Sequence, residues 1–333
     1  MALRKFSSTG IGRIVRCNTT HRSLRYYSSS SSSPSVSTDE VTHFSSLGSS
    51  WWDPVGPSRV LHLMNPLRHD FIASCLADHD TAGAGLKYLD VGCGGGIFAE
   101  SIARTISSTP SSSLSSSSSA TRAASVLGID PSPTLIRIAR EHARTDPIVD
   151  THLRTGRFEY RNATLEALIA AEQQLPDDTH KYDVVTLFEV LEHIDSSSPM
   201  AFLANCLQLV RPGGWLIGST IARSLPSLMI NRIIAEAPWP IGVVPRGTHE
   251  WSKFVNPDEL RRWLAAAAAA AAVGSSAVWR CTGVVYFPGL GWRIVSGSET
   301  WGNYFWGVRK GIQSSVTSSR PPAENEKGEK GRE

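Results

Sequence analysis

A candidate catalytic cluster follows an apolar run in the middle of the chain. Directly after Tyr182–Phe188 come Glu189, Glu192 and His193, at relative positions i, i+3 and i+4. One helical turn would bring the two carboxylates and the imidazole to one face. Such an oxygen-rich set favours Mg²⁺ or Mn²⁺ over structural zinc. The same spacing is found at a solvated helix start, where acidic residues are favoured by the helix dipole, and spacing alone favours that interpretation over a metal site.

A second candidate site is the glycine-rich turn Gly92-Cys93-Gly94-Gly95-Gly96, which Asp90 precedes. A turn between a strand and a helix presents backbone amides to a ligand, and glycines leave room for its approach. The dinucleotide fingerprint Gly-x-Gly-x-x-Gly is not met, because the sixth position is Ile97 or Ala99; only the looser form that ends in alanine fits. Asp90 would repel a pyrophosphate but would pair with the ammonium of S-adenosylmethionine. The turn therefore favours that cofactor, with Gly92 and Gly94 beside it, over a nicotinamide dinucleotide.

Asp130 is the expected acceptor for the ribose hydroxyls of such a cofactor. It lies 34 residues after Gly96, which is more than the separation of about 20 that is typical of this role. Without the 13 residues of the serine-rich run 107–119, the separation is 21. The run is therefore interpreted as an inserted surface loop. A plain tight turn with a helix-capping aspartate would account for the same residues without a ligand.

Alternating strands and helices must position these groups. Buried strands that alternate with helices predict a parallel sheet covered on both faces. We expect an α/β fold: a Rossmann-like, seven-stranded, mostly parallel sheet with helices on both faces. The alanine run 265–272 is expected to continue a helix that opens at Pro257. Strands are expected at 87–91, 125–129, 158–161, 182–188, 215–219, 278–283 and 303–309, and helices at 97–106, 133–144 and 200–209.

Composition limits the class of protein. The chain has 333 residues, of which 41% are apolar and 19% charged, which is enough apolar content for a packed core. The net charge is +3, but residues 1–38 hold six basic residues and no acidic one, so the remainder carries −3. This argues against a nucleic-acid binder. There is no run of 18 uncharged apolar residues and no Cys-x-x-Cys pair among five cysteines, so we expect neither a membrane-spanning helix nor a disulfide or zinc framework.

Four segments are expected to lie outside the packed core of a domain over 39–310. The acid-free, arginine- and serine-rich residues 1–38 are typical of a mitochondrial transit peptide, with a basic disordered tail as the alternative. The serine-rich run 107–119 is the inserted surface loop described above. Residues 221–250 are apolar with few charges, and we expect a lid that docks on a membrane, although core packing explains them equally. Residues 311–333 are expected to be a disordered tail.

Several motifs together resemble the ubiquinone-biosynthesis O-methyltransferases over residues 44–309. The Trp-Trp-Asp-Pro and Leu-His-Leu-Met-Asn-Pro-Leu-Arg elements are far more specific than the glycine turn. The motifs are Trp51–Pro54, Leu61–Arg68, Leu89–Gly96, Phe188–His193 and Pro245–His249.

The resemblance implies a class I methyltransferase that uses S-adenosylmethionine. Its substrates would be catechol-type hydroxyls on polyprenylated rings, namely 3,4-dihydroxy-5-polyprenylbenzoate and demethylubiquinol. It also implies that Arg68, Gly92, Asp130 and Phe188 contact the cofactor. Glu189, Glu192 and His193 would bind Mg²⁺ or another divalent cation, which reverses the balance reached from spacing alone.

The expected mechanism places the acceptor hydroxyl in line with the methyl group and favours its ionised form. Glu189 and His193 are the expected catalytic residues, with His193 as a general base if no cation acts. The expected partners are a polyprenylated catechol or quinol, the matrix face of the mitochondrial inner membrane and a multi-subunit ubiquinone-biosynthesis complex, with no nucleic acid. Alternatives are a catalytically silent scaffold subunit of such a complex, a methyltransferase of another phenol, and a nicotinamide-dependent dehydrogenase.

Overall fold

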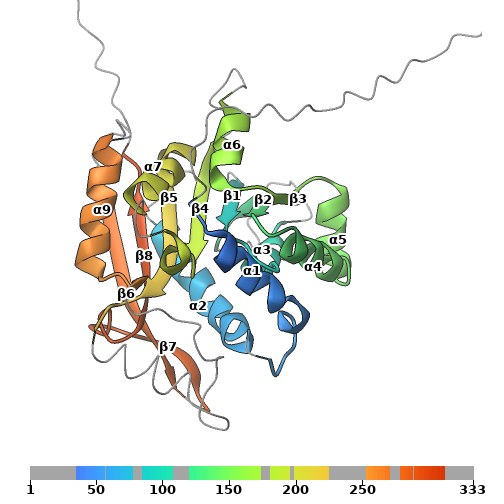
Figure 1. Ribbon diagram of the computed structural model, residues 1–333, viewed down its shortest axis with the longest axis horizontal. Coiled ribbons are helices and arrows are strands. Elements are labelled where there is room, and N and C mark those ends of the chain that lie inside the picture. The colour runs from blue at the N-terminus through green and yellow to red at the C-terminus, as the bar shows by residue number, and fades with distance from the viewer. Residues whose placement is uncertain are drawn as a thin grey trace, which may run out of the picture. The chain divides into compact units, whose positions relative to one another are not determined.

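The computed structural model describes residues 35–56, 58–77, 85–107, 120–173, 181–195, 199–224, 253–270, 278–287 and 289–311, all of which belong to one compact unit (Figure 1). Its helices are α1 (Thr38–Ser46), α2 (Arg59–Leu76), α3 (Ile97–Ala103), α4 (Pro133–Ala143), α5 (Pro147–Arg154), α6 (Leu165–Glu172), α7 (Pro199–Leu209) and α9 (Pro257–Ala270), with single 3-10 turns η1 (Gly48–Ser50) and η3 (Leu191–His193). Its strands are β1 (Leu86–Val91), β2 (Ala123–Asp130), β3 (Phe158–Asn162), β4 (Tyr182–Phe188), β5 (Val210–Ile221), β6 (Val278–Phe287), β7 (Gly291–Val295) and β8 (Asn303–Arg309).

The strands form a mixed sheet in the order β3-β2-β1-β4-β5-β8-β6-β7. Neighbours from β3 to β5 are parallel, whereas β8, β6 and β7 continue the sheet in antiparallel pairs. The Rossmann-like α/β class is confirmed. The expected count of seven strands is wrong, because the described residues form eight. The extra strand, β7, is the short outer arm of a hairpin with β6.

Helices cover both faces of the sheet, and alternation along each strand decides which core a side chain joins. In β1, Leu89 and Val91 belong to the core under α6, α7 and α9. Tyr88 of the same strand belongs to the core under α2, α3, α4 and α5. Every residue of β4 is buried, as expected for a central parallel strand. Because helices cover both faces, a ligand is expected to bind at the edge formed by the carboxyl ends of the parallel strands.

Helix starts explain much of the local order. Ser132 caps α4 by accepting a hydrogen bond from the backbone of Leu135, and Pro133 follows at the first helical position. Asp146 and Pro147 begin α5 in the same way. The helix expected to open at Pro257 is confirmed as α9, which runs through the alanines to Ala270.

Most of the segments expected outside the core lie outside the described residues. These are residues 1–34, 108–119, 225–252 and 312–333, which include nearly all of the proposed leader, serine insertion, lid and tail. Among the helices that are described, none is both long and apolar enough to cross a membrane.

Candidate functional site

The glycine turn after β1 is shaped by three left-handed residues. Gly92, Gly94 and Gly96 have φ angles of +70°, +54° and +93°. A Cβ at Gly94 would lie 2.6 Å from a ring carbon of Trp51, because the indole packs directly over the turn. The Nε1 of Trp51 is buried and has no hydrogen-bond partner in the described part of the chain. The turn therefore requires glycine both for backbone conformation and for space.

Two buried aspartates lie at the ends of β1 and β2. Asp90 accepts a hydrogen bond of 2.7 Å from the hydroxyl of Thr186, and burial raises its pKa to about 7. Asp130 accepts hydrogen bonds from the backbone N–H groups of Gly94 (3.0 Å) and Ser132 (2.8 Å). Burial raises the pKa of Asp130 to about 6. Asp130 thus holds the turn in place, and each carboxylate oxygen keeps a lone pair for a ligand hydroxyl.

Arg68 reaches the same place from α2. Its guanidinium is buried and lies 4.8 Å from the centre of the Phe188 ring, at the end of β4. It donates to the side chain of Asn65 and lies in the field of Asp90, Glu189 and Glu192. Its Nε has no hydrogen-bond partner in the part of the chain that is described. The structure thus brings Arg68, Asp90, Asp130 and Phe188 to one edge of the sheet, as expected.

Glu189 and Glu192 form a carboxyl pair just beyond β4. The backbone of Glu189 has a φ of +56°, an unusual value for a residue with a side chain. Its carboxylate accepts from the hydroxyl of Ser219 (2.5 Å) and from the amide of Asn303 (3.4 Å). Glu192 is buried and accepts from Thr220. Burial and the neighbouring charge of Glu189 hold the pKa of Glu192 well above its ordinary value.

His193 does not join this pair, which corrects the expected three-residue cluster. Its Nδ1 lies 3.2 Å from the carboxylate of Glu40 in α1. Among the described residues, no group of three His, Cys, Asp or Glu side chains is placed to hold a metal ion. The physical reason is that the helical turn η3 covers only Leu191–His193, while Glu189 lies before it with a left-handed backbone, so the three side chains do not share one helical face. An α-helix was assumed in the expectation.

Glu40 is a site neighbour that the sequence did not reveal. Its side chain pairs with both His193 and Lys253, and the hydrogen bonds to these two partners lower the pKa of Glu40 to about 2 despite partial burial. The ring of Phe44, one turn along α1, meets the His193 ring edge-on at 4.7 Å. The only available signal was the pattern of Glu40 and Phe44 at i and i+4, which is common in any helix.

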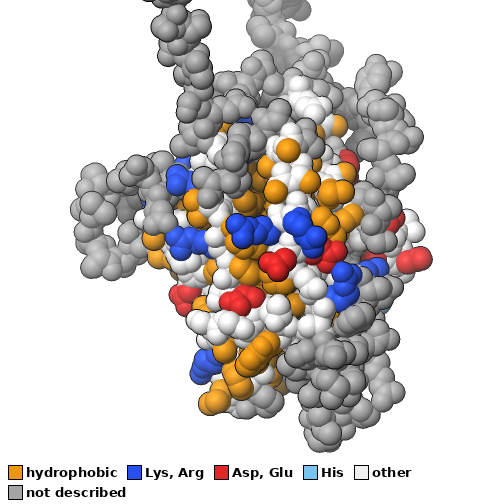
Figure 2. Space-filling view, turned by 90° about the vertical axis from the view of Figure 1, so that its left-hand side faces the viewer, with side chains coloured by type: hydrophobic (Ala, Val, Ile, Leu, Met, Phe, Trp, Pro, Cys, Tyr) orange, Lys and Arg blue, Asp and Glu red, His pale blue; other side chains and the backbone are white. Residues whose placement is uncertain are grey.

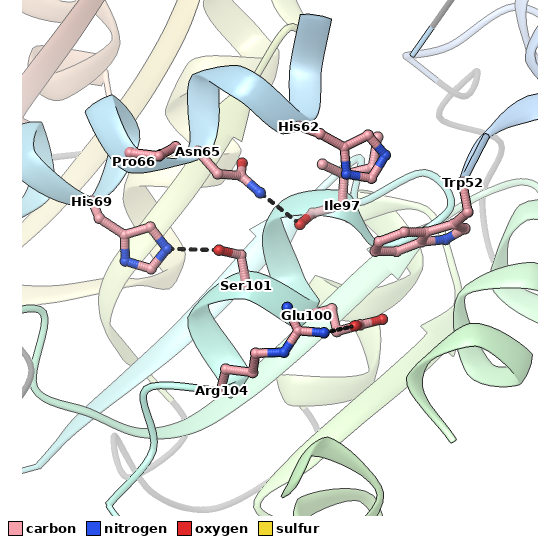
Figure 3. A pocket seen from close by; sticks show the side chains of 9 residues that line it. All are labelled: Trp52, His62, Asn65, Pro66, His69, Ile97, Glu100, Ser101 and Arg104. Atoms are coloured by element: carbon pink, nitrogen blue, oxygen red, sulfur yellow. Dashed lines mark hydrogen bonds and ion pairs between the residues drawn. The ribbon is translucent and has the colours of Figure 1, made fainter. Parts of the chain in front are cut away.

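A pocket of about 320 Å³ lies between α2 and α3, next to the glycine turn (Figure 3). Asn65 donates to the carbonyl of Ile97, and His69 is paired with Ser101. The Nε1 of Trp52 donates to the carbonyl of Gly95. Trp52 and Asn65 thereby tie the segments around α2 to the turn and the start of α3.

Known proteins resemble the chain over most of its length. A family model described as a methyltransferase domain matches residues 61–268. The ubiquinone biosynthesis O-methyltransferase of Methylobacterium sp. (strain 4-46) is 34% identical over 297 residues, which are 87% of this chain and 98% of the relative. The mitochondrial ubiquinone biosynthesis O-methyltransferase of Schizosaccharomyces pombe is 39% identical over 69% of this chain and 71% of its own.

Solved structures resemble it more distantly. A methyltransferase from Thermotoga maritima, described as dependent on S-adenosylmethionine and as a possible histamine N-methyltransferase, is 13% identical. Its TM-score is 0.48, and the match covers 81% of this chain and 99% of that one.

Proposed function

Because the chain belongs to the family of ubiquinone biosynthesis O-methyltransferases, we propose that it methylates ring hydroxyls of polyprenylated catechols or quinols. The methyl donor is S-adenosylmethionine, the cofactor of this class of enzyme. When bound, its sulfonium supplies an activated methyl group. The substrates we propose are 3,4-dihydroxy-5-polyprenylbenzoate and demethylubiquinol.

The observation that carries the proposal is an unfilled set of polar groups at the carboxyl edge of the sheet. The buried Nε of Arg68 and the Nε1 of Trp51 each lack an acceptor within the described residues, and both side chains lie at this edge. A buried donor without a partner is unfavourable, so a ligand with acceptor groups is the natural complement. The carboxylate of the donor would suit Arg68 and its ammonium would suit Asp90.

The acceptor hydroxyl is placed, in our proposal, beside Glu189 and His193. Glu189 is held by Ser219 and Asn303, so its carboxylate is fixed in orientation before any ligand arrives. His193 would accept the hydroxyl proton as a general base, since proton removal makes the oxygen a better nucleophile. The remainder of the catalysis is positioning, because the methyl group needs only an oxygen held in line.

We also propose that Mg²⁺ or another divalent cation binds to the pair formed by Glu189 and Glu192. Two adjacent carboxyls that repel each other's charge are a fitting donor set for a cation, whereas His193 is engaged by Glu40. A cation there would favour ionisation of a ligand hydroxyl. Chelation is therefore expected to lower activity.

The proposed site of action is the matrix face of the mitochondrial inner membrane, as part of a ubiquinone-biosynthesis complex. Residues 1–38 would be the transit peptide, 39–310 the catalytic domain, 221–250 a lid and 311–333 a tail. The β6–β7 hairpin supports membrane contact. Its strand β6 passes Val284, which is level with Asn303 at the carboxyl edge, and continues to an apolar tip with Phe287 and Leu290 exposed. Hydrophobic side chains also gather at the lower edge of Figure 2.

Transfer of a labelled methyl group from S-adenosylmethionine to a short-tailed catechol tests the proposal, with and without EDTA. We expect labelled product with wild-type protein and less of it after chelation. Cofactor binding without product on any catechol would instead favour the silent scaffold. Full activity in EDTA would remove the cation while leaving methyl transfer intact.

A further inference from the structure

The segment around α1 is attached to the turn that carries His193. The backbone N–H of Asp195 donates to the carbonyl of Ser35 at 3.0 Å, and Val36 forms a β-bridge with Ile194. These contacts place the start of α1 against the residues that directly follow η3. The helix is therefore fixed relative to His193 by backbone as well as by side chains.

One carboxylate of α1 bridges two elements. The Oε2 of Glu40 lies 3.2 Å from the Nδ1 of His193, and its Oε1 accepts from the Nζ of Lys253 at 2.8 Å. All three side chains are largely shielded from solvent, with exposed fractions of 19%, 18% and 27%. Phe44 packs on the imidazole from the same face of the helix. The ring is thus held by a hydrogen bond at one nitrogen and by an aromatic contact.

From this arrangement we infer that Glu40 is a positioning residue, which fixes the tautomer and the orientation of His193 for the methyl-transfer reaction. The inference rests on the proposed function. An ionised carboxylate only accepts hydrogen bonds, so the Nδ1 of His193 must carry the hydrogen. In the neutral ring the lone pair is then on Nε2, which is the nitrogen left for the acceptor hydroxyl. The carboxylate of a catalytic triad holds its histidine in the same way.

A purely structural role is the competing explanation. Glu40 also pairs with Lys253, which precedes α9, so it could serve only to attach α1 to the domain. A tether would affect the unfolding temperature and cofactor affinity, whereas a positioning residue affects the chemical step. The separate measurement of kcat, of KM for each substrate and of unfolding temperature distinguishes the two.

The experiment compares full-length Glu40→Ala and Glu40→Gln with wild type. Asp39→Asn is the matched control, because Asp39 lies in the same first turn of α1 but is exposed. For Glu40→Ala we expect kcat on a short-tailed catechol to fall roughly 10- to 100-fold, with KM for S-adenosylmethionine changed less than about twofold. Glu40→Gln keeps an oxygen acceptor and is expected to recover part of the loss. It also serves as the test if the alanine variant does not fold.

A spectroscopic readout is independent of activity. In full-length protein labelled with ¹⁵N-histidine, the His193 nitrogens are assigned by their loss in His193→Gln. We expect the Nδ1–H tautomer in wild type and in Asp39→Asn, and a mixture of tautomers in Glu40→Ala. An unchanged tautomer in Glu40→Ala, or a kcat equal to that of Asp39→Asn, overturns the inference. Wild-type protein that methylates no catechol refutes the proposed function instead.

Discussion

At the scale of single residues, the main feature of the site is its buried carboxyl groups, whose neutral forms are favoured by burial. The pKa of Asp90 is raised to about 7 and that of Asp130 to about 6, mainly because both are removed from water. The hydrogen bond from Thr186 and the charge of Arg68 lower the pKa of Asp90, but by less than burial raises it. A cationic group of a ligand would therefore stabilise the ionised forms of these carboxyl groups, and the ammonium of S-adenosylmethionine is such a group.

Asp90→Asn is expected to stabilise the unliganded protein at alkaline pH. The pKa of Asp90 rises from 3.8 in the unfolded chain to about 7 in the fold, so stability is lost as pH rises between these values. Asparagine keeps the acceptor for Thr186 but carries no charge. The gain in unfolding temperature should therefore grow from pH 5 to pH 8 and reach several degrees. Thermal unfolding measured from pH 5 to pH 8 checks this prediction. The control is Asp70→Asn at an exposed position, where we expect the change in unfolding temperature to be the same across this range. An equal effect of Asp90→Asn at both pH values would contradict the burial of its charge.

Gly94→Ala is expected to damage the cofactor turn more than its backbone angle alone explains. A residue with a Cβ in the left-handed region costs about 1–2 kcal/mol in any context. At Gly94 the added carbon would also lie 2.6 Å from the Trp51 ring, whereas at Gly156, with φ +71°, nothing lies within 4 Å. Chemical unfolding of both variants separates the two contributions. We expect Gly94→Ala to lose more stability than Gly156→Ala and also to bind S-adenosylhomocysteine less tightly. Equal losses of stability in the two variants would mean that the Trp51 ring moves away from the added carbon at no cost.

At the scale of elements, the sequence predicted the buried strands well and the peripheral pieces poorly. The bounds of β4 and β8 are those expected, because continuous apolar runs have only one way to be buried in a sheet. The helices α1, α2, α5 and α6 were not predicted. Three of them have only eight or nine residues, and α2 contains Pro66, a residue that normally marks the end of a helix. β7 was missed because its exposed arginine and isoleucine obscure any alternation. The wrong position of His193 has the same origin: an i, i+3, i+4 pattern does not distinguish an α-helix from a 3-10 turn.

The β6–β7 hairpin leads to a prediction about membranes. Phe287 is 41% exposed and Leu290 66%, at a tip beyond the edge where the acceptor is expected. Burial of such side chains in an interface contributes about 1.5–3 kcal/mol each. We expect Phe287→Ser with Leu290→Ser to weaken co-sedimentation with cardiolipin-containing vesicles at least about tenfold, and to leave kcat on a short-tailed catechol unchanged.

The control for the hairpin is Val55→Ser. Val55 is 85% exposed but precedes α2 and is not part of the hairpin. Its substitution should leave vesicle binding at the wild-type level. Undiminished binding by the hairpin variant would assign membrane contact to another segment, such as the proposed lid at 221–250.

At the scale of the whole molecule, the proposed cofactor site joins parts of the chain that lie far apart in the sequence. Arg68 comes from α2, Asp90 and Asp130 from the ends of two neighbouring strands, and Phe188 from a third. The N-terminal residues Trp51 and Trp52 close on the turn from outside the sheet. A ligand bound among them connects α2 to the sheet. Its binding energy therefore stabilises the attachment of the N-terminal segment as well as the site.

Hydrogen exchange with and without S-adenosylhomocysteine tests this connection. A ligand at 100 times its Kd stabilises the bound state by about 2.7 kcal/mol, which slows the openings that release what it touches. We expect increased protection of α2 and of the turn 92–96, and unchanged exchange in α6, which packs against α7 in the core on the other face of the sheet from α2. In Arg68→Met the protection of α2 should largely disappear while that of the turn persists in part, because the guanidinium is the main charged link from the helix to the ligand. Protection spread evenly over all described elements would instead mean that α2 opens only when the whole domain unfolds.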